Sequence, residues 1–311
     1  MAQVEEELTR QASSQVPLIE SIGQYICRSG GKRVRPAILL LGSQMCGYDG
    51  PIGSKLGAVI EMIHSATLVH DDIIDNASVR RGRASVNAQW GNEITVLMGD
   101  WLYMTSFRLA LGERHFKVLD VLIEATRKMI EGELIQLSLN GNLDITEEQH
   151  LDISMRKTAF LFSASSQLGA ILGSVDEEKE ECLRLYGFNV GLAFQLVDDV
   201  LDLTSNESTL GKPVGSDLKE GKLTLPLIYL MRDGKPHHRE LVKKALRENN
   251  SNASVMDEVI QLVREHKMSD RVLEKAHEYA QEARDCLKAF PSSKAREALL
   301  AIPDYIVERD R

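Results

Sequence analysis

The feature that most constrains the fold is an acidic pattern, Asp-Asp-x-x-Asp, which occurs at residues 71–75 and again at residues 198–202. Each copy lies in an apolar segment with helical spacing, where a carboxylate is costly to bury without a partner. On a helix, the first and last aspartates of each copy share one face because they are four residues apart. We therefore expect each copy to direct several carboxylate oxygens toward one point.

Carboxylate clusters of this kind are typical of sites for hard divalent cations. The candidate metal ligands are the six aspartates of the two copies, namely Asp71, Asp72, Asp75, Asp198, Asp199 and Asp202. A ligand set of oxygens without cysteine favours Mg2+, which usually keeps several waters and takes further ligands from phosphate groups. A solvated helix face would explain either cluster alone, but it explains poorly two clusters embedded in apolar sequence. The sequence thus predicts two carboxylate clamps for a metal-bound diphosphate.

Composition and periodicity predict an all-α fold. The chain has 311 residues, of which 43% are hydrophobic and 5% aromatic, and residues that favour helices are plentiful. Apolar residues recur at helical intervals between short turns that contain Gly, Asn or Asp. We expect one domain over residues 1–311, a single large helical bundle with the aspartate-bearing helices in its centre. The more polar residues 249–311 are expected to form a C-terminal helical part.

Charge and cysteine usage indicate a cytoplasmic protein without a nucleic-acid partner. The net charge of −9 leaves no general basic surface to release counterions from a nucleic acid. The four cysteines show no CxxC spacing, which is typical of free thiols in a reducing compartment. The first residues carry no signal-peptide pattern, and no apolar run reaches the roughly 18 residues that a membrane span requires.

Basic residues flank both acidic clusters. A turn that begins with Gly30-Gly31 places three cations before an apolar helix, namely Lys32, Arg33 and Arg35. Backbone N–H groups at a helix start, together with Lys and Arg, form an anion site. Further basic residues follow each cluster or lie between them, namely Arg80, Arg81, Arg83, Lys157, Lys212, Lys219 and Lys222. This pattern predicts two diphosphate sites, one bridged through Mg2+ to the carboxylates and one held by basic side chains alone.

These motifs make the chain similar to the trans-isoprenyl diphosphate synthases of the polyprenyl synthetase family over nearly its whole length. The motifs are GGKRVRP from Gly30, HDDIID from His70 followed by RRG, the Lys157-Thr158 pair, and GLAFQLVDDVLD from Gly191 followed by GKPVGSDLKEGKLTLP. The resemblance implies an all-α bundle of the isoprenoid synthase type around a deep central cavity, usually in a homodimer. It also implies a chain-elongating prenyltransferase that condenses isopentenyl diphosphate with an allylic diphosphate, here expected to be farnesyl or geranylgeranyl diphosphate.

The resemblance further implies roles for individual residues. The aspartates of both clusters would bind up to three Mg2+ ions on the allylic diphosphate, and Thr158 and Gln195 would line the reacting centre. The residues that would contact the allylic diphosphate are Arg80, Lys157, Lys212 and Lys222. The residues that would hold isopentenyl diphosphate are Lys32, Arg35, His64 and Arg81. In the implied mechanism, Mg2+ and these cations stabilise the leaving diphosphate, and a dry apolar cavity protects the allylic cation.

Two small residues before the first acidic cluster predict the product length. Ala66 and Thr67 lie about one helical turn before Asp71, where members of the family that stop at farnesyl or geranylgeranyl length carry bulky aromatics. We therefore expect an all-trans product of hexaprenyl to decaprenyl length, with a short-chain synthase as the alternative. The tunnel floor would come from deeper residues, for which the candidates are Met62, Met98, Tyr103, Met129 and Leu134. A long product is poorly soluble, so transient membrane association during its release is a further expectation.

Three other classes of protein fit the sequence less well. A di-iron carboxylate bundle requires two Glu-x-x-His pairs. The pairs Glu61–His64 and Glu147–His150 have this spacing, but the second pair is expected at a helix start on the surface, and the aspartates would stay unexplained. A terpene cyclase would replace the second aspartate cluster with an Asn/Ser/Glu motif. A non-catalytic synthase subunit would lack both clusters, whereas this chain keeps them and is expected to be catalytic.

Overall fold

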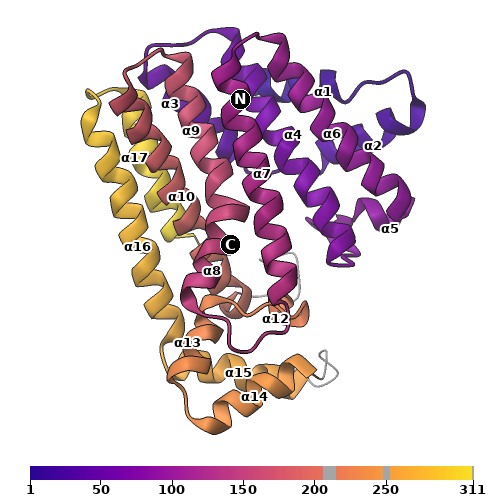
Figure 1. Ribbon diagram of the computed structural model, residues 1–311, viewed down its shortest axis with the longest axis vertical. Coiled ribbons are helices and arrows are strands. Elements are labelled where there is room, and N and C mark those ends of the chain that lie inside the picture. The colour runs from indigo at the N-terminus through magenta and orange to yellow at the C-terminus, as the bar shows by residue number, and fades with distance from the viewer. Residues whose placement is uncertain (206–214, 248–252, 310–311) are drawn as a thin grey trace. The chain divides into compact units, whose positions relative to one another are not determined.

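The computed structural model describes residues 1–205, 215–247 and 253–309, and these residues are almost entirely helical (Figure 1). The prediction of an all-α fold is confirmed. The chain divides into two compact units. The first unit comprises residues 1–126, 161–187 and 286–300, and the second comprises residues 127–160, 188–285 and 301–311. The prediction of one domain around a deep cavity stays a prediction. In the described part of the chain, no helix combines the length and apolar character that crossing a membrane requires.

The long helix α4 (Pro51–Ile74) organises the first unit. The other helices that lie wholly in this unit are α1 (Ala2–Gln11), α2 (Pro17–Arg28), α3 (Val34–Met45), α5 (Val86–Trp90) and α6 (Asn92–Gly112). Helix α4 is apolar along most of its length and packs against α1, α3, α5 and α6. One hydrophobic cluster of this unit contains Val4, Leu8, Ala58, Met62, Ala66, Val69, Met98 and Leu102. Because α4 is held on several sides, the aspartates at its C-terminal end have fixed positions.

A short hairpin follows α4 and carries the Arg-Arg-Gly-Arg motif. Its strands β1 (Val79–Arg80) and β2 (Arg83–Ala84) pair antiparallel, with Arg80 opposite Arg83. The two residues between the strands, Arg81 and Gly82, have φ angles of 52° and 73°. Tight two-residue hairpin turns of this kind require positive φ at both positions, which accounts for the glycine. The hairpin therefore fixes Arg80 and Arg81 at one place beside the end of α4.

Helix α13 (Leu225–Asp233) lies in the interior of the second unit. Seven successive residues from Leu225 to Met231 are buried, as expected for a helix that is apolar on all sides. It packs against α8 (Glu147–Ser154), α14 (Pro236–Arg247) and α15 (Ala253–Glu265), and the short helix α12 (Ser216–Lys219) precedes it. Helices that contribute residues to both units are α7 (Phe116–Leu139), α9 (Phe160–Leu172), α10 (Glu177–Thr204), α16 (Met268–Cys286) and α17 (Lys294–Val307). A 3-10 turn, η2 (Leu287–Ala289), follows α16.

A π-helical turn, η1 (Met155–Ala159), connects α8 to α9 and carries the Lys157-Thr158 pair. Helix α8 starts with a capping box, in which the Thr146 hydroxyl accepts from Gln149 N and the Gln149 side chain accepts from Thr146 N. A Cβ atom at Gly132 of α7 would lie 2.7 Å from the Arg156 Cβ atom. Only glycine therefore lets α7 approach η1 this closely. Wide π-turns of this kind occur frequently at functional sites.

Candidate functional site

The first acidic cluster lies at the C-terminal end of α4, and its three aspartates have different environments. Asp72 is buried, and its Oδ1 atom accepts from Arg80 Nε at 2.7 Å and from Arg80 Nη2 at 2.6 Å. Burial raises the pKa of the Asp72 carboxyl, and the Arg80 guanidinium offsets this rise only in part. Asp71 and Asp75 are half-buried. The two outer aspartates are therefore the accessible ones, whereas Asp72 holds Arg80.

The cations of the basic turn before α3 have different partners. Arg33 donates to Glu61 at 2.6 Å and to Glu5 at 2.7 Å, so its charge is committed to two glutamates. The Arg35 guanidinium lies over the Phe162 ring at 4.3 Å, and Arg81 donates to the Gly30 carbonyl. Arg35 and Arg81, two of the residues predicted to hold a second diphosphate, both lie near His64 in this unit.

His64 lies among these cations on α4. Burial and the neighbouring guanidinium groups, Arg35 first among them, lower the pKa of His64 well below its ordinary value. The imidazole is therefore neutral near pH 7, and the positive charge of this site comes from arginine and lysine alone.

The second acidic cluster lies near the end of α10, where two of its aspartates are buried. Asp199 accepts from Gln195 Nε2 at 3.0 Å and from Leu225 N at 3.2 Å, and its Oδ2 atom lies 2.6 Å from His150 Nε2. Asp202 accepts from the Ser216 hydroxyl at 2.8 Å. Asp198 is different, because 43% of its side chain is exposed. Its carboxylate pairs with Arg309.

His150 is buried, so the predicted surface position is wrong for this residue, whereas the Glu147 side chain is 22% exposed. The helix start at Glu147 is confirmed, but α8 turns its fourth residue toward Asp199. Burial lowers the pKa of His150, and the Asp199 carboxylate more than offsets this effect, so the net shift is upward. No sequence motif indicates this contact, because the two residues are 49 positions apart.

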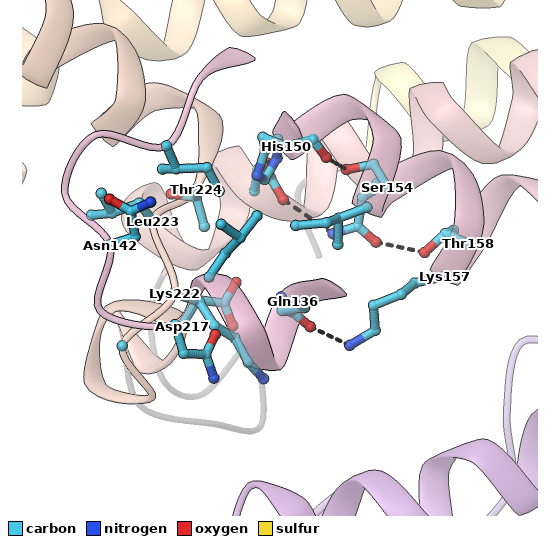
Figure 2. Close-up of a pocket in the computed structure, with 17 residues that line it drawn as sticks. Gln136, Asn142, His150, Ser154, Lys157, Thr158, Asp217, Lys222, Leu223 and Thr224 are labelled. Atoms are coloured by element: carbon cyan, nitrogen blue, oxygen red, sulfur yellow. Dashed lines mark hydrogen bonds and ion pairs between the residues drawn. The ribbon is translucent and has the colours of Figure 1, made fainter. Parts of the chain in front are cut away.

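A pocket in the second unit gathers many of the predicted residues (Figure 2). Those that line it are Lys157, Thr158, Gln195, Asp199 and Lys222. The Thr158 hydroxyl donates to Gln195 Oε1 at 2.8 Å, and Gln195 in turn donates to Asp199. The Lys157 ammonium contacts Gln136, as Figure 2 shows, and also Glu133. The wall also contains residues that the sequence did not single out for this site, namely Gln136, Asn142, His150, Asp217 and Thr224.

Of the two residues predicted to set product length, Ala66 lies in the core of the first unit, and Thr67 is half-buried. Ala66 is fully buried in the same cluster as Met62 and Met98, with Tyr103 packed against it. The Thr67 hydroxyl donates to the His64 carbonyl at 2.7 Å. Among the floor candidates of the second unit, Met129 is buried, whereas 62% of Leu134 is exposed. Leu134 therefore does not point into a closed cavity of its own unit. Lys212 lies outside the described residues.

Within the described residues, no three His, Cys, Asp or Glu side chains come together as a group that could hold a metal ion. The accessible carboxylates at the two clusters offer oxygen atoms alone. This donor type fits Mg2+, which commonly takes one or two carboxylates, substrate phosphates and waters as ligands.

Comparison with known proteins shows similarity along the whole chain. Residues 16–263 match the sequence model described as polyprenyl synthetase. The octaprenyl diphosphate synthases of Haemophilus influenzae and Escherichia coli are each 39% identical to this chain, over 100% of it and 94% and 96% of their own lengths. A polyprenyl synthase from Caulobacter crescentus, solved with calcium and isoprenyl diphosphate, superposes with a TM-score of 0.96 at 37% identity, covering 100% of this chain and 95% of that one. A decaprenyl diphosphate synthase from Rhodobacter capsulatus gives a TM-score of 0.94 at 35% identity, covering 100% and 96%.

Proposed function

Because this chain belongs to the polyprenyl synthetase family and is a chain-elongating prenyltransferase, we propose that it makes an all-trans polyprenyl diphosphate of hexaprenyl to decaprenyl length. It would add isopentenyl diphosphate units to an allylic diphosphate such as farnesyl or geranylgeranyl diphosphate. The observation that carries the proposal is the hydrogen-bonded series from Thr158 through Gln195 to Asp199, beside Lys157 and Lys222 in one pocket. The small size of Ala66 and Thr67 and the names of the octaprenyl relatives support the long product.

We propose Mg2+ as the metal, with up to three ions on the bound diphosphate. Asp71 and Asp75 in the first unit and Asp198 in the second would be the direct ligands, because their carboxylates are accessible. The buried aspartates, Asp72, Asp199 and Asp202, would not bind the metal directly. Their hydrogen bonds and ion pairs within the chain would hold the neighbouring ligands in position. When bound, the metal withdraws charge from the departing diphosphate.

The basic residues of the pocket hold the allylic diphosphate. Lys157 and Lys222 would pair with its oxygens and stabilise the charge that grows as the allylic C–O bond breaks. Arg80 and Lys212 are assigned to the same diphosphate. Apolar wall residues exclude water from the allylic cation, namely Leu139, Ile145, Ile153 and Leu223. The proton lost from the new chain passes to the departing diphosphate, so no side chain is needed as a base.

The cationic site of the first unit is assigned to isopentenyl diphosphate. Lys32, Arg35 and Arg81 supply the charge, and His64 supplies a neutral hydrogen-bonding group. The guanidinium groups suit this role because they bind phosphate oxygens in a bidentate manner.

We also propose that the chain works as a homodimer in the cytoplasm, with transient membrane contact during product release. Two helices expose large apolar side chains at intervals of seven residues, which keeps them on one face. On α6 they are Leu97, Met104 and Leu111, and on α7 they are Phe116, Ile123, Ile130 and Leu137. These two sets are called the apolar stripes. Stripes of this length are typical of helix–helix interfaces between subunits.

Product analysis tests the proposed activity. The purified chain is incubated with Mg2+, labelled isopentenyl diphosphate and farnesyl diphosphate, and the dephosphorylated products are resolved by length. A ladder that ends at hexaprenyl or longer is expected. A ladder that stops at geranylgeranyl would support the short-chain alternative. Absence of product with every allylic primer would contradict autonomous catalysis by this chain.

A further inference from the structure

Arg309 is held against α10 by several contacts, and only 4% of its side chain is exposed. Its Nη2 atom donates to the Asp198 carboxylate and, at 2.8 Å, to the Phe194 carbonyl oxygen. The guanidinium also stacks on the Phe194 ring, 3.9 Å from its centroid. All three contacts are made to one turn of α10.

The partner that Arg309 selects is the exposed aspartate of the second cluster. Asp199 and Asp202 are buried and accept from groups of the chain interior, among them Gln195 and Ser216. Asp198 faces outward, and its carboxylate is the one proposed above as a direct metal ligand. A cation therefore already lies at the position where the proposed function requires a metal.

Arg309 does not use all of its hydrogen-bond donors in this position. Its Nε atom is buried without a hydrogen-bond partner, and an unsatisfied buried donor costs free energy. The ion pair and the stacking contact offset this cost only while the Asp198 carboxylate carries no other cation. A guanidinium and a divalent ion on one carboxylate repel each other strongly at such short range.

We propose that Arg309 is a positioning residue that neutralises Asp198 before loading and is exchanged for the metal when the metal–diphosphate complex binds. This inference rests on the proposed role of Asp198 as a metal ligand. Docked Arg309 keeps the Asp198 carboxylate oriented and prevents free divalent ions from occupying it tightly. The metal must displace Arg309, so metal binding and release of residues 308–309 from α10 are one coupled step.

Metal binding without turnover tests the exchange. Mn2+ binding to the full chain is measured by electron paramagnetic resonance for the wild type and for Arg309→Gln, Asp198→Asn and Arg284→Gln. Arg284→Gln is the matched control, because it removes an ion pair with Asp304 of α17 that does not involve α10. Arg309→Gln is expected to bind Mn2+ about fivefold more tightly, in keeping with the modest strength of partly exposed ion pairs. The control should bind as the wild type does, and Asp198→Asn should lose this site.

Hydrogen exchange provides a second measurement that needs no variant. Mn2+ with inorganic diphosphate should speed the exchange of backbone amides at residues 305–309 in the wild type. Unchanged or weaker Mn2+ binding by Arg309→Gln, or no change in exchange, would overturn the inference and leave the metal site intact. If Asp198→Asn binds Mn2+ as the wild type does, then the proposed role of Asp198 fails, and the inference fails with it. If Arg309→Gln does not fold, the exchange measurement alone decides.

Discussion

The six aspartates of the two acidic clusters differ at the level of single residues. Neighbouring positions on a helix point about 100° apart, so the first and second aspartates of each cluster cannot face the same environment. Asp72 and Asp199 turn inward to protein partners, whereas Asp71 and Asp198 are accessible. Aspartates of the same motif thus differ in their contacts, and substituting an accessible or a buried aspartate should have different effects.

Replacing an accessible aspartate should impair turnover without unfolding the chain. Asp71→Ala is expected to lower kcat/KM by at least about a hundredfold, because the lost interaction is with metal in the transition state. Its free energy of unfolding should change by less than about 1 kcal/mol, since the side chain is not buried. Steady-state kinetics and urea unfolding measure the two quantities. Asp120→Ala, an exposed change on α7, is the control, and near-normal activity of Asp71→Ala would contradict the assignment.

His64 should make the chain less stable in mild acid. Its folded pKa lies well below the ordinary value, so below about pH 6.5 the unfolded chain binds a proton that the folded chain does not. Stability is therefore lost as the pH falls through that value. His64→Gln should make the slope of unfolding free energy against pH shallower, by up to about 1.4 kcal/mol per pH unit. Urea unfolding between pH 5 and 7 checks this, and an unchanged slope for His64→Gln would exclude the effect.

At the level of elements, the shape of η1 depends on a glycine in another helix. A side chain at Gly132 would push against Arg156 and the Lys157 backbone. Gly132→Ala is expected to cost about 1–3 kcal/mol of stability and to lower kcat/KM by displacing Lys157. Gly112→Ala is the matched control, because nothing lies within 4 Å of its added Cβ atom. Thermal unfolding and kinetics should separate the two variants, and equal behaviour would argue against a positioning role for Gly132.

Helix α4 should control product length through Ala66. Ala66→Phe places a ring in a packed cluster and is expected to shorten the product to roughly farnesyl or geranylgeranyl length. Overfilling a core also costs about 1–3 kcal/mol. Ala58→Phe is the matched control, since Ala58 is equally buried in the same cluster. It should be destabilised with an unchanged product ladder. A full-length ladder from Ala66→Phe would mean that the growing chain runs elsewhere.

The sequence predicted the helical class, the two acidic clusters and five of the pocket residues, because each depends on short-range spacing. It did not predict η1, whose wide turn forms where Gly132 of α7 allows close approach. Nor did it predict the buried contact between His150 and Asp199, or that between Arg309 and Asp198. These features depend on contacts between residues far apart in the chain, which periodicity and motifs do not report.

At the level of the whole molecule, the apolar stripes predict the oligomeric state. A charge in each stripe should disrupt a self-complementary interface, since a buried unpaired charge is costly. The double variant Met104→Glu/Ile123→Glu is expected to be monomeric by light scattering, whereas the wild type should be dimeric. Leu185→Glu alters an exposed apolar residue outside the stripes and should stay dimeric. A dimeric double variant would place the interface on another surface.

The hydrogen bonds from Thr158 through Gln195 to Asp199 also determine which atoms in the pocket can donate and which can accept. An ionised carboxylate only accepts, so Asp199 obliges Gln195 to present its amide nitrogen, and the amide oxygen must then face Thr158. The single hydroxyl hydrogen of Thr158 is thereby used, and the atom offers a ligand only lone pairs. Lone pairs attract an electron-poor carbon and repel phosphate oxygens. Under the proposed function, the ammonium groups of Lys157 and Lys222 would receive the anionic end of a ligand, and the Thr158 oxygen would face its cationic carbon.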